Sequence, residues 1–264
     1  MDITKRNNVH VIGHGTRTFL FVNGFGCDQT IWHSLTPALL SRYKLVLYDH
    51  VGAGLSDISA YDANRYSTLQ GYAQDVLDIC QHLALQDVVL VGHSVGGTIA
   101  ALAAIAEPER FAQLMLLCPS PCYLNDEHYQ GGFERLDVEQ MLAFMDQDFV
   151  GWADSFASFI MGTPDRPSLS VELAHRFCQN DPVIAKRFAR VTFLSDNRAD
   201  MAQLRTPCLL VQCAEDLIAP PTVGEFLQMV IPGATLVTLP ISGHCPHVSA
   251  PMDTLSVIES YLAA

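Results

Sequence analysis

The stretch VVLVGHSVGGTIAALAAIA, residues 88–106, decides the interpretation of the rest of the chain. A β-branched run leads into Gly92-His-Ser-Val-Gly96, and an alanine-rich run with high helical propensity follows. Gly-x-Ser-x-Gly between a strand and a helix forms a nucleophile elbow, a turn so tight that the residues two before and two after the serine must lack a Cβ. Gly92 and Gly96 meet that need. Ser94 is therefore predicted to be a nucleophile; the alternative is a tight-turn serine without chemistry.

Short apolar runs recur along the chain with helical patterns between them. The runs do not alternate polar with apolar residues, so both faces of each strand would be buried, as in a parallel sheet. They cover residues 18–24, 44–50, 88–93, 114–119, 208–216 and 235–240. Helices are expected around 30–41, 67–84, 95–107, 221–230 and 251–263, where Pro220, Pro221 and Pro251 stand at helix starts. The alternation predicts an α/β fold with a mostly parallel, doubly wound sheet.

Residues 120–199 break this alternation. They show helical patterns, no convincing strand and many aromatic side chains. A helical insertion of this kind usually covers the carboxyl edge of the sheet, where open α/β folds bind ligands. We therefore expect one core domain, 1–119 and 200–264, with a helical lid at 120–199. The alternative for most of the aromatics is that they form the lid's own core.

The composition excludes several classes of partner. Lys and Arg number 15 against 28 Asp and Glu, and the formal charge of −13 would repel nucleic acid and anionic membranes. The apolar fraction of 49% is ample for a core, but no apolar run approaches the length of a membrane span. Residues 1–15 contain no apolar stretch of signal-peptide length, so we expect a cytoplasmic protein.

The eight cysteines are expected to be reduced, because several stand in apolar strand-like runs, where cysteine behaves as a small hydrophobe. Cys118-Pro-Ser-Pro-Cys122 has no pair of histidines nearby, so we expect no zinc site there. Neither a metal nor a cofactor is expected anywhere in the chain.

An activated serine needs a base and a group that orients the base. In the α/β-hydrolases, whose elbow residues 88–106 resemble, the chain order is Ser, then Asp or Glu, then His. Of the ten histidines, His244 and His247 alone follow the last predicted strand. His244 follows a glycine at the carboxyl edge of the sheet and is the predicted base, whereas His247 is expected to be structural.

Asp216 ends the preceding predicted strand and is the expected orienting carboxylate. The adjacent Glu215 would point elsewhere. Asp49 also ends a strand, but it precedes the serine, and we expect it to brace a loop.

An oxyanion hole should come from two backbone amides. One belongs to Val95, which follows the nucleophile. The other is expected from Phe25, in the glycine-rich turn after the first strand, where Gly24 and Gly26 let the backbone approach closely.

Several segments together resemble one group of α/β-hydrolases, which contains the bacterial stress-response regulator RsbQ and the plant karrikin and strigolactone receptors. The resemblance covers essentially the whole chain, and GFGCDQ and GHCPH look closer to the bacterial branch. The segments are FVNGFGCDQTIW (21–32), LYDHVGAGLSD (47–57), GHSVGG (92–97), YLNDEHYQGGFE (123–134), FLSDNRADM (193–201), CAEDLIAP (213–220) and SGHCPHVSAP (242–251).

This resemblance implies an α/β-hydrolase fold with a four-helix, V-shaped lid above a deep apolar pocket. It places the family's catalytic positions on Ser94, Asp216 and His244, and the oxyanion hole on Phe25 and Val95. Its pocket-lining positions fall on His93, Tyr123, Phe133, Phe156, Phe193, Leu217 and Ile218.

Two functions fit these observations. The first is a serine hydrolase that cleaves a small, largely apolar ester or lactone through an acyl-enzyme. The second is an RsbQ-like ligand-sensing protein that signals to a regulatory protein partner, with slow or single-turnover hydrolysis. A cofactor-free oxygenase or C–C bond hydrolase on the same scaffold is a third possibility.

Overall fold

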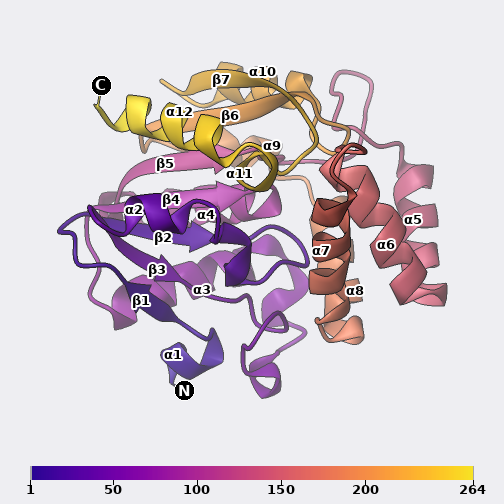
Figure 1. Ribbon diagram of the computed structural model, residues 1–264, viewed down its shortest axis with the longest axis horizontal. Helices are drawn as coiled ribbons and strands as arrows, with labels where there is room; N and C mark the ends of the chain where they lie inside the picture. Colours follow the sequence, from indigo (N-terminus) through magenta and orange to yellow (C-terminus); the bar gives the residue numbers. More distant parts are fainter. Residues whose placement is uncertain (1, 264) are drawn as a thin grey trace.

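The computed structural model describes residues 2–263, which form a seven-stranded sheet flanked by helices (Figure 1). The strand order is β1-β3-β2-β4-β5-β6-β7, and every pairing is parallel except that of β1 with β3. The strands are β1 His10–Ile12, β2 Thr18–Val22, β3 Lys44–Leu47, β4 Val88–His93, β5 Phe111–Leu117, β6 Cys208–Glu215 and β7 Thr235–Ser242. All six predicted strands are present, and the predicted α/β fold with a mostly parallel sheet is confirmed. The exposed edge strand β1 was not predicted.

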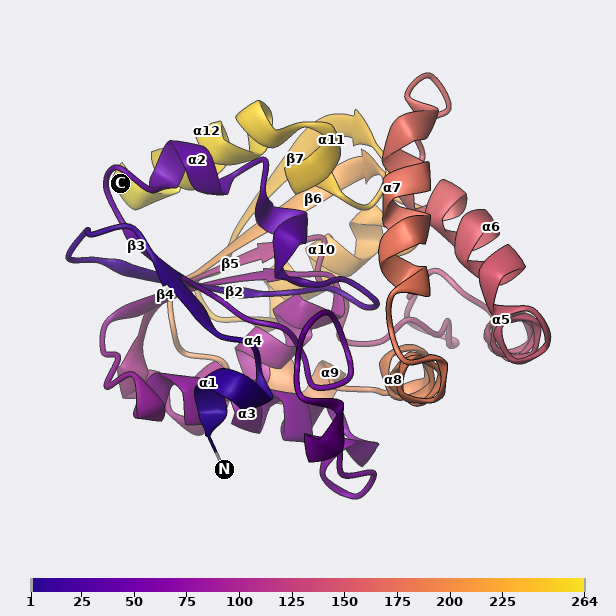
Figure 2. The ribbon, with the colours of Figure 1, turned by 60° about the horizontal axis from the view of Figure 1, so that its bottom comes forward.

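Helices cover both faces of the sheet, which is why its central strands carry apolar side chains on both sides. Every residue of β2 and β4 is buried. Figure 2 shows α2 and α12 on one side of the sheet and α3 and α4 on the other. The helices outside the segment between β5 and β6 are α1 Ile3–Arg6, α2 Thr36–Leu39, α3 Leu69–His82, α4 Val95–Ala106, α10 Pro221–Val230, α11 Pro246–Ser249 and α12 Pro251–Ala263. Short 3-10 turns cover Gln29–Trp32, Ile58–Ala60, Arg65–Ser67 and Pro108–Arg110.

The helix starts follow the prolines. Pro221 is the first residue of α10, with Pro220 as its N-cap, and Pro251 begins α12. Proline suits a first helical position because its fixed φ is helical and it lacks only an N–H that has no partner there. The helix expected over 30–41 is instead a 3-10 turn, Gln29–Trp32, followed by the single turn of α2.

Between β5 and β6 the chain forms four helices that stand together at one end of the sheet (Figure 1). We call them the four-helix insertion: α5 Arg135–Gln147, α6 Phe149–Met161, α7 Pro167–Cys178 and α8 Pro182–Leu194. The short helix α9, Arg198–Met201, leads from the insertion back to the sheet. All four helices fall inside the range predicted for the lid. The domain boundaries at 119/120 and 199/200 stay a prediction.

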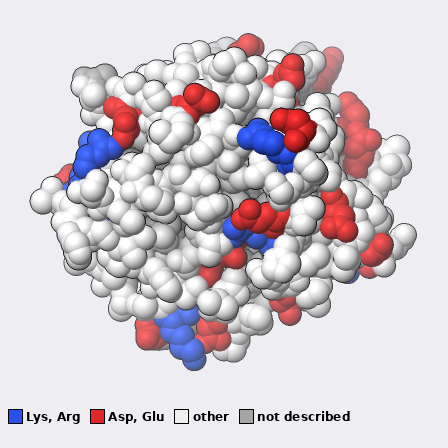
Figure 3. Space-filling view, viewed as in Figure 1, with Lys and Arg blue, Asp and Glu red and all other residues white. Residues whose placement is uncertain are grey.

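The surface carries scattered charge. On the face shown in Figure 3, basic side chains lie beside acidic ones. The ion pairs Arg42–Glu259 and Arg176–Glu172 are of this kind. Within residues 2–263, no helix is long and apolar enough to cross a membrane.

Candidate active site

Ser94 occupies a strained turn between β4 and α4. Its φ is +56° and its ψ is −129°, a backbone conformation that non-glycine residues rarely adopt. Its N–H donates to the carbonyl of Leu117 at 2.9 Å. A Cβ on Gly92 would lie 2.6 Å from the carbonyl oxygen of Gly96, and a Cβ on Gly96 would lie 2.4 Å from that of Asn23. The two glycines therefore allow the turn, as the sequence predicts.

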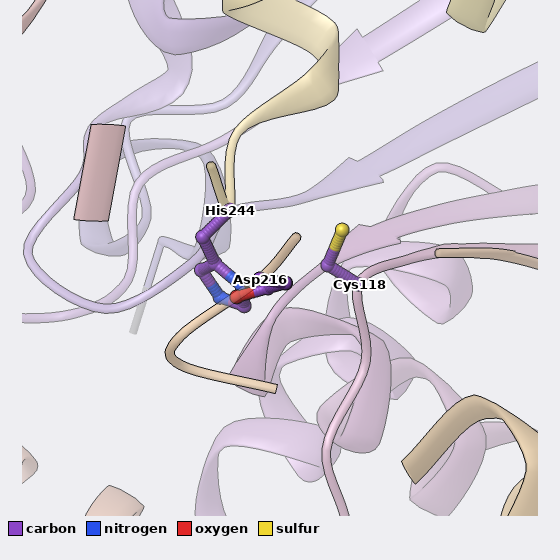
Figure 4. A group of neighbouring side chains, drawn as sticks. All are labelled: Cys118, Asp216 and His244. Carbon is purple, nitrogen blue, oxygen red and sulfur yellow. Dashed lines mark hydrogen bonds and ion pairs between the residues drawn. The ribbon is translucent and has the colours of Figure 1, made fainter. Parts of the chain in front are cut away.

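The hydroxyl of Ser94 meets His244 and Asp216 in one hydrogen-bonded line. The Oγ of Ser94 lies 2.7 Å from Nε2 of His244, and Nδ1 of His244 lies 2.7 Å from Oδ2 of Asp216 (Figure 4 shows the Asp–His pair). All three side chains are buried. Oδ1 of Asp216 accepts the backbone N–H groups of Ile218 at 2.8 Å and Ala219 at 3.1 Å. These bonds fix the carboxylate so that its other oxygen faces the imidazole.

The alternative acids and the alternative base have other contacts and do not bond to Ser94. Glu215 is exposed, and its carboxylate accepts a hydrogen bond of 2.5 Å from the hydroxyl of Ser242. Asp49 accepts the backbone N–H of Gln29 at 2.8 Å and that of Leu55 at 3.0 Å, so it braces two loops. His247 is buried against the ring of Trp32, with 4.6 Å between ring centroids.

Two backbone N–H groups are predicted to bind an anionic oxygen: that of Val95, which follows Ser94 in the chain, and that of Phe25, in the loop after β2. Within the described residues, the amides of Phe25 and Val95 donate to no protein acceptor, although Ser94 and Cys27 beside them donate to carbonyls. Val95 is also the first residue of α4, where the helix dipole favours negative charge. These amides suit an oxyanion hole, and their role stays a prediction.

Helix α7 holds the loop that carries Phe25. The Nδ2 group of Asn180, just after α7, donates to the carbonyl of Gly26 at 2.8 Å. A Cβ on Gly26 would lie 2.5 Å from the ring of Phe177, so this ring packs directly on the loop. Arg176 pairs with Asp28 at 3.0 Å. The four-helix insertion and the Phe25 loop are therefore joined by three side chains of one helix end.

A small cavity of about 20 Å³ lies above Ser94, between the ends of the strands and the four-helix insertion. Four of the predicted pocket residues line it: His93, Phe156, Phe193 and Ile218. The full lining is Phe25, Cys27, His93, Ser94, Phe156, Ile160, Leu173, Phe177, Thr192, Phe193, Ile218, His244 and Cys245.

The other three predicted pocket residues differ in position. The hydroxyl of Tyr123 lies 3.1 Å from the Oγ of Ser94. Phe133 is buried behind Phe193, with 6.1 Å between the ring centroids, and is not among the described residues that line the cavity. The prediction for Leu217 is wrong, since its side chain is 61% exposed. The tight turn that Asp216 caps places Ile218 on the cavity and Leu217 on the solvent side.

Known proteins share this architecture. Residues 19–256 match the family described as Alpha/beta hydrolase family. The Strigolactone esterase D14 of Arabidopsis thaliana is 38% identical over 262 residues, which cover 99% of this chain and 98% of that protein. The chain is an α/β-hydrolase.

Two further comparisons agree. The Karrikin insensitive 2 receptor CA of Petunia hybrida is 35% identical to this α/β-hydrolase over 98% of the chain and 97% of that receptor. A solved structure of a hydrolase from Oleispira antarctica is 39% identical and superposes with a TM-score of 0.96, covering 100% of this chain and 97% of that one. The resemblance to the group with the karrikin and strigolactone receptors is confirmed. The closer likeness to its bacterial branch stays a prediction.

Sequence reasoning missed how His93 contacts the triad of the hydrolase. Burial and the nearby His244 lower the pKa of His93 to about 3, so its ring is neutral at pH 7. Its Nε2 lies 2.8 Å from the backbone carbonyl of His244, and it must carry the proton that this bond requires. The residue before the nucleophile therefore holds the backbone of the base. Its position beside Ser94 in the elbow was the available signal.

Cys118 stands next to the Asp–His pair (Figure 4). Its Sγ, a carboxylate oxygen of Asp216 and a ring nitrogen of His244 all lie within 4.8 Å of one another. Burial raises the pKa of the Cys118 thiol, which contacts the Sγ of Cys213 at 3.4 Å. Because Asp216 and His244 are hydrogen-bonded to each other, this group is two members of the triad with a neutral thiol beside them. All eight cysteines are free.

Proposed function

We propose that this α/β-hydrolase cleaves small, largely apolar carboxylic esters or lactones through an acyl-enzyme on Ser94. The observation that carries the proposal is the line of hydrogen bonds from Ser94 through His244 to Asp216 at the base of an apolar cavity. The relatives named as esterases support the same reaction class.

The geometry supports a two-step reaction. In the first step, Oγ of Ser94 attacks the acyl carbon while Nε2 of His244 takes the hydroxyl proton. The amides of Phe25 and Val95 stabilise the charge on the tetrahedral oxygen. The leaving alcohol departs with the proton from His244, and Ser94 keeps the acyl group.

In the second step, His244 takes a proton from water, and the hydroxide oxygen attacks the acyl carbon. The acid leaves and Ser94 recovers its proton. Asp216 holds the imidazole in the orientation that both steps need and stabilises the imidazolium formed in each.

Ligand sensing is the second candidate. Three relatives from Petunia hybrida are named receptors, and the end of α7 joins the four-helix insertion to the Phe25 loop. A ligand that moved α7 would also move a catalytic amide, and a partner protein could detect the altered helices. The eight free cysteines support a cytoplasmic location for either function.

Rates on p-nitrophenyl acetate and on δ-valerolactone test the first function, with acid release followed over many equivalents of enzyme. Sustained turnover is the expected result, and an absence of hydrolysis on both substrates contradicts it. One equivalent of product, together with ligand-dependent capture of a partner, would favour sensing.

A further inference from the structure

The helix side of the cavity contains one polar side chain. Within the described residues, α6, α7 and α8 contribute Phe156, Ile160, Leu173, Phe177, Thr192 and Phe193 to the lining. Only Thr192 among these carries an oxygen or a nitrogen, and it is 1% exposed. The other polar side chains of the cavity lie on the sheet side: Ser94 bonds to the imidazole of His244, and Nε2 of His93 bonds to the His244 carbonyl, while Nδ1 of His93 has no partner within the described residues.

The hydroxyl of Thr192 has no hydrogen-bond partner in residues 2–263. A threonine inside a helix usually returns its hydroxyl to the carbonyl one turn earlier. Here Thr192 lies near the end of α8 and makes no such bond. A buried hydroxyl without a partner is unfavourable, because its hydrogen bonds to water are lost and nothing replaces them.

Packing does not account for a hydroxyl at this position. Valine has nearly the shape of threonine and would fill the same space among aromatic and aliphatic side chains without an unpaired polar atom. Thr206 also has a buried hydroxyl without a partner, but it does not line the cavity. Of these two threonines, only Thr192 lines the cavity, so only Thr192 stands where a bound ligand would supply the missing partner.

We propose that Thr192 selects the substrate by hydrogen bonding to a second oxygen of the ligand, away from the reacting carbonyl. This proposal rests on the proposed function, since it places the ester carbonyl at Ser94. The substrate class is then a short apolar ester or lactone that carries one further ether, carbonyl or hydroxyl oxygen. The rest of that ligand contacts apolar side chains.

The test compares esters of equal shape that differ by one oxygen. On the acyl side, p-nitrophenyl methoxyacetate is compared with p-nitrophenyl butanoate. On the alcohol side, 2-methoxyethyl acetate is compared with butyl acetate. For each pair the selectivity is kcat/KM of the ether ester divided by kcat/KM of its hydrocarbon counterpart, so that intrinsic reactivity cancels between variants.

Thr192→Val should lower the selectivity in at least one pair by about fivefold, the effect of one neutral hydrogen bond. Thr192→Ser should keep most of the wild-type selectivity, because it retains the hydroxyl. Thr206→Val is the matched control and should leave the selectivity unchanged. Selectivities of Thr192→Val within twofold of wild type in both pairs would overturn the proposal, as would equal losses in the Val and Ser variants.

A binding measurement separates this proposal from the proposed function. The affinity of methoxyacetate and butanoate esters is measured calorimetrically on Ser94→Ala and on Ser94→Ala with Thr192→Val. A preference for the ether ester that disappears with Thr192→Val supports the role of Thr192 even if the wild type hydrolyses no ester. An unchanged preference refutes the role even if hydrolysis is fast.

Discussion

The two sides of the cavity differ in chemistry. The sheet side presents Ser94 and His244, which bond to each other, and Asp216 behind them bonds to His244 and to two backbone amides. The helix side is aromatic and aliphatic apart from Thr192. The sheet side is fixed by the strained elbow and by strand ends, whereas the helix side belongs to a segment inserted between two strands.

This difference separates reaction from selection. The hydrogen-bonded triad provides the nucleophile and the proton transfers that the hydrolysis of every ester needs, whichever acyl group the ester carries. An apolar wall of side chains sets which acyl group fits. Changes on the sheet side should therefore lower the rate on all substrates alike, and changes on the helix side should alter the ratio of rates between substrates.

The largest effect is expected from Ser94→Ala. Removal of the nucleophile should lower kcat on p-nitrophenyl acetate by about 10⁴-fold or more, because the other triad members cannot act without it. Circular dichroism and a thermal melt should show an intact fold, since only the hydroxyl is lost. Retention of more than about a tenth of the wild-type rate would place the nucleophile elsewhere.

Asp216→Asn and His244→Ala should be nearly as damaging, with losses of about 10³-fold to 10⁴-fold in kcat. Glu215→Gln is the matched control for the first, because it is the neighbouring carboxylate that bonds only Ser242. Steady-state kinetics on one ester compares all three variants. A larger loss in Glu215→Gln than in Asp216→Asn would mean that the orienting carboxylate is misassigned.

Asn180→Ala tests whether the insertion also contributes to the reaction. Loss of its bond to the Gly26 carbonyl should loosen the loop that carries the Phe25 amide and lower kcat about tenfold on every ester, since small misplacements of a catalytic group are costly. KM should change little. Gln179→Ala is the control, because Gln179 is the exposed neighbour of Asn180. A loss of thermal stability without a change in kcat would restrict Asn180 to a structural role.

Phe156 and Phe133 have different places on the helix side: Phe156 lines the cavity, and Phe133 packs behind the lining. Phe156→Ala enlarges the cavity and should raise the rate on hexanoate relative to acetate about tenfold. Phe133→Ala removes a packed ring behind the lining and should cost about 3–5 kcal/mol of unfolding free energy with little change in that ratio. A thermal melt and an ester chain-length series on both variants make the comparison. The reverse pattern would place Phe133 in the cavity wall.

The smallest effect concerns stability and pH. Burial lowers the pKa of His50, His93 and His247 below the ordinary value of 6.5. The unfolded chain therefore binds more protons than the folded protein below about pH 6.5, so stability is full above that pH and falls as the pH is lowered towards 3.

His247→Phe should remove one of these groups and keep a ring against Trp32. When the pH is lowered from 7 to 5, the unfolding free energy of this variant should fall by about 2 kcal/mol less than that of the wild type. His33→Gln, at an exposed position, is the control and should follow the wild type. Urea titrations at several pH values measure the difference, and parallel losses in all three proteins would contradict the assignment.

The sequence was most informative where local chemistry determines structure. The elbow at Ser94 depends on two glycines that have no alternative there, and the apolar runs can be buried on both faces only in a covered parallel sheet. Those features predicted the fold, and with it that Ser94, Asp216 and His244 would lie together. The edge strand β1 was missed because its three residues are exposed and carry no apolar pattern.

The helix side was less predictable, because its surface depends on how four helices pack. Leu217 and Ile218 are adjacent and both apolar, yet one faces solvent and the other the cavity. Thr192 resembles any helical threonine until its surroundings are known. The contacts of Asn180 with Gly26 join residues far apart in the chain, and no local pattern indicates them.

Covalent labelling tests the central claim most directly. The wild type and His244→Ala are treated with a fluorophosphonate, and the adduct is located by intact mass and peptide mapping. The wild type should gain one adduct, on Ser94, and His244→Ala should react far more slowly, because its serine has no base. Labelling at a cysteine such as Cys27 or Cys245 with Ser94 unmodified, or equal rates in the two proteins, would contradict the account.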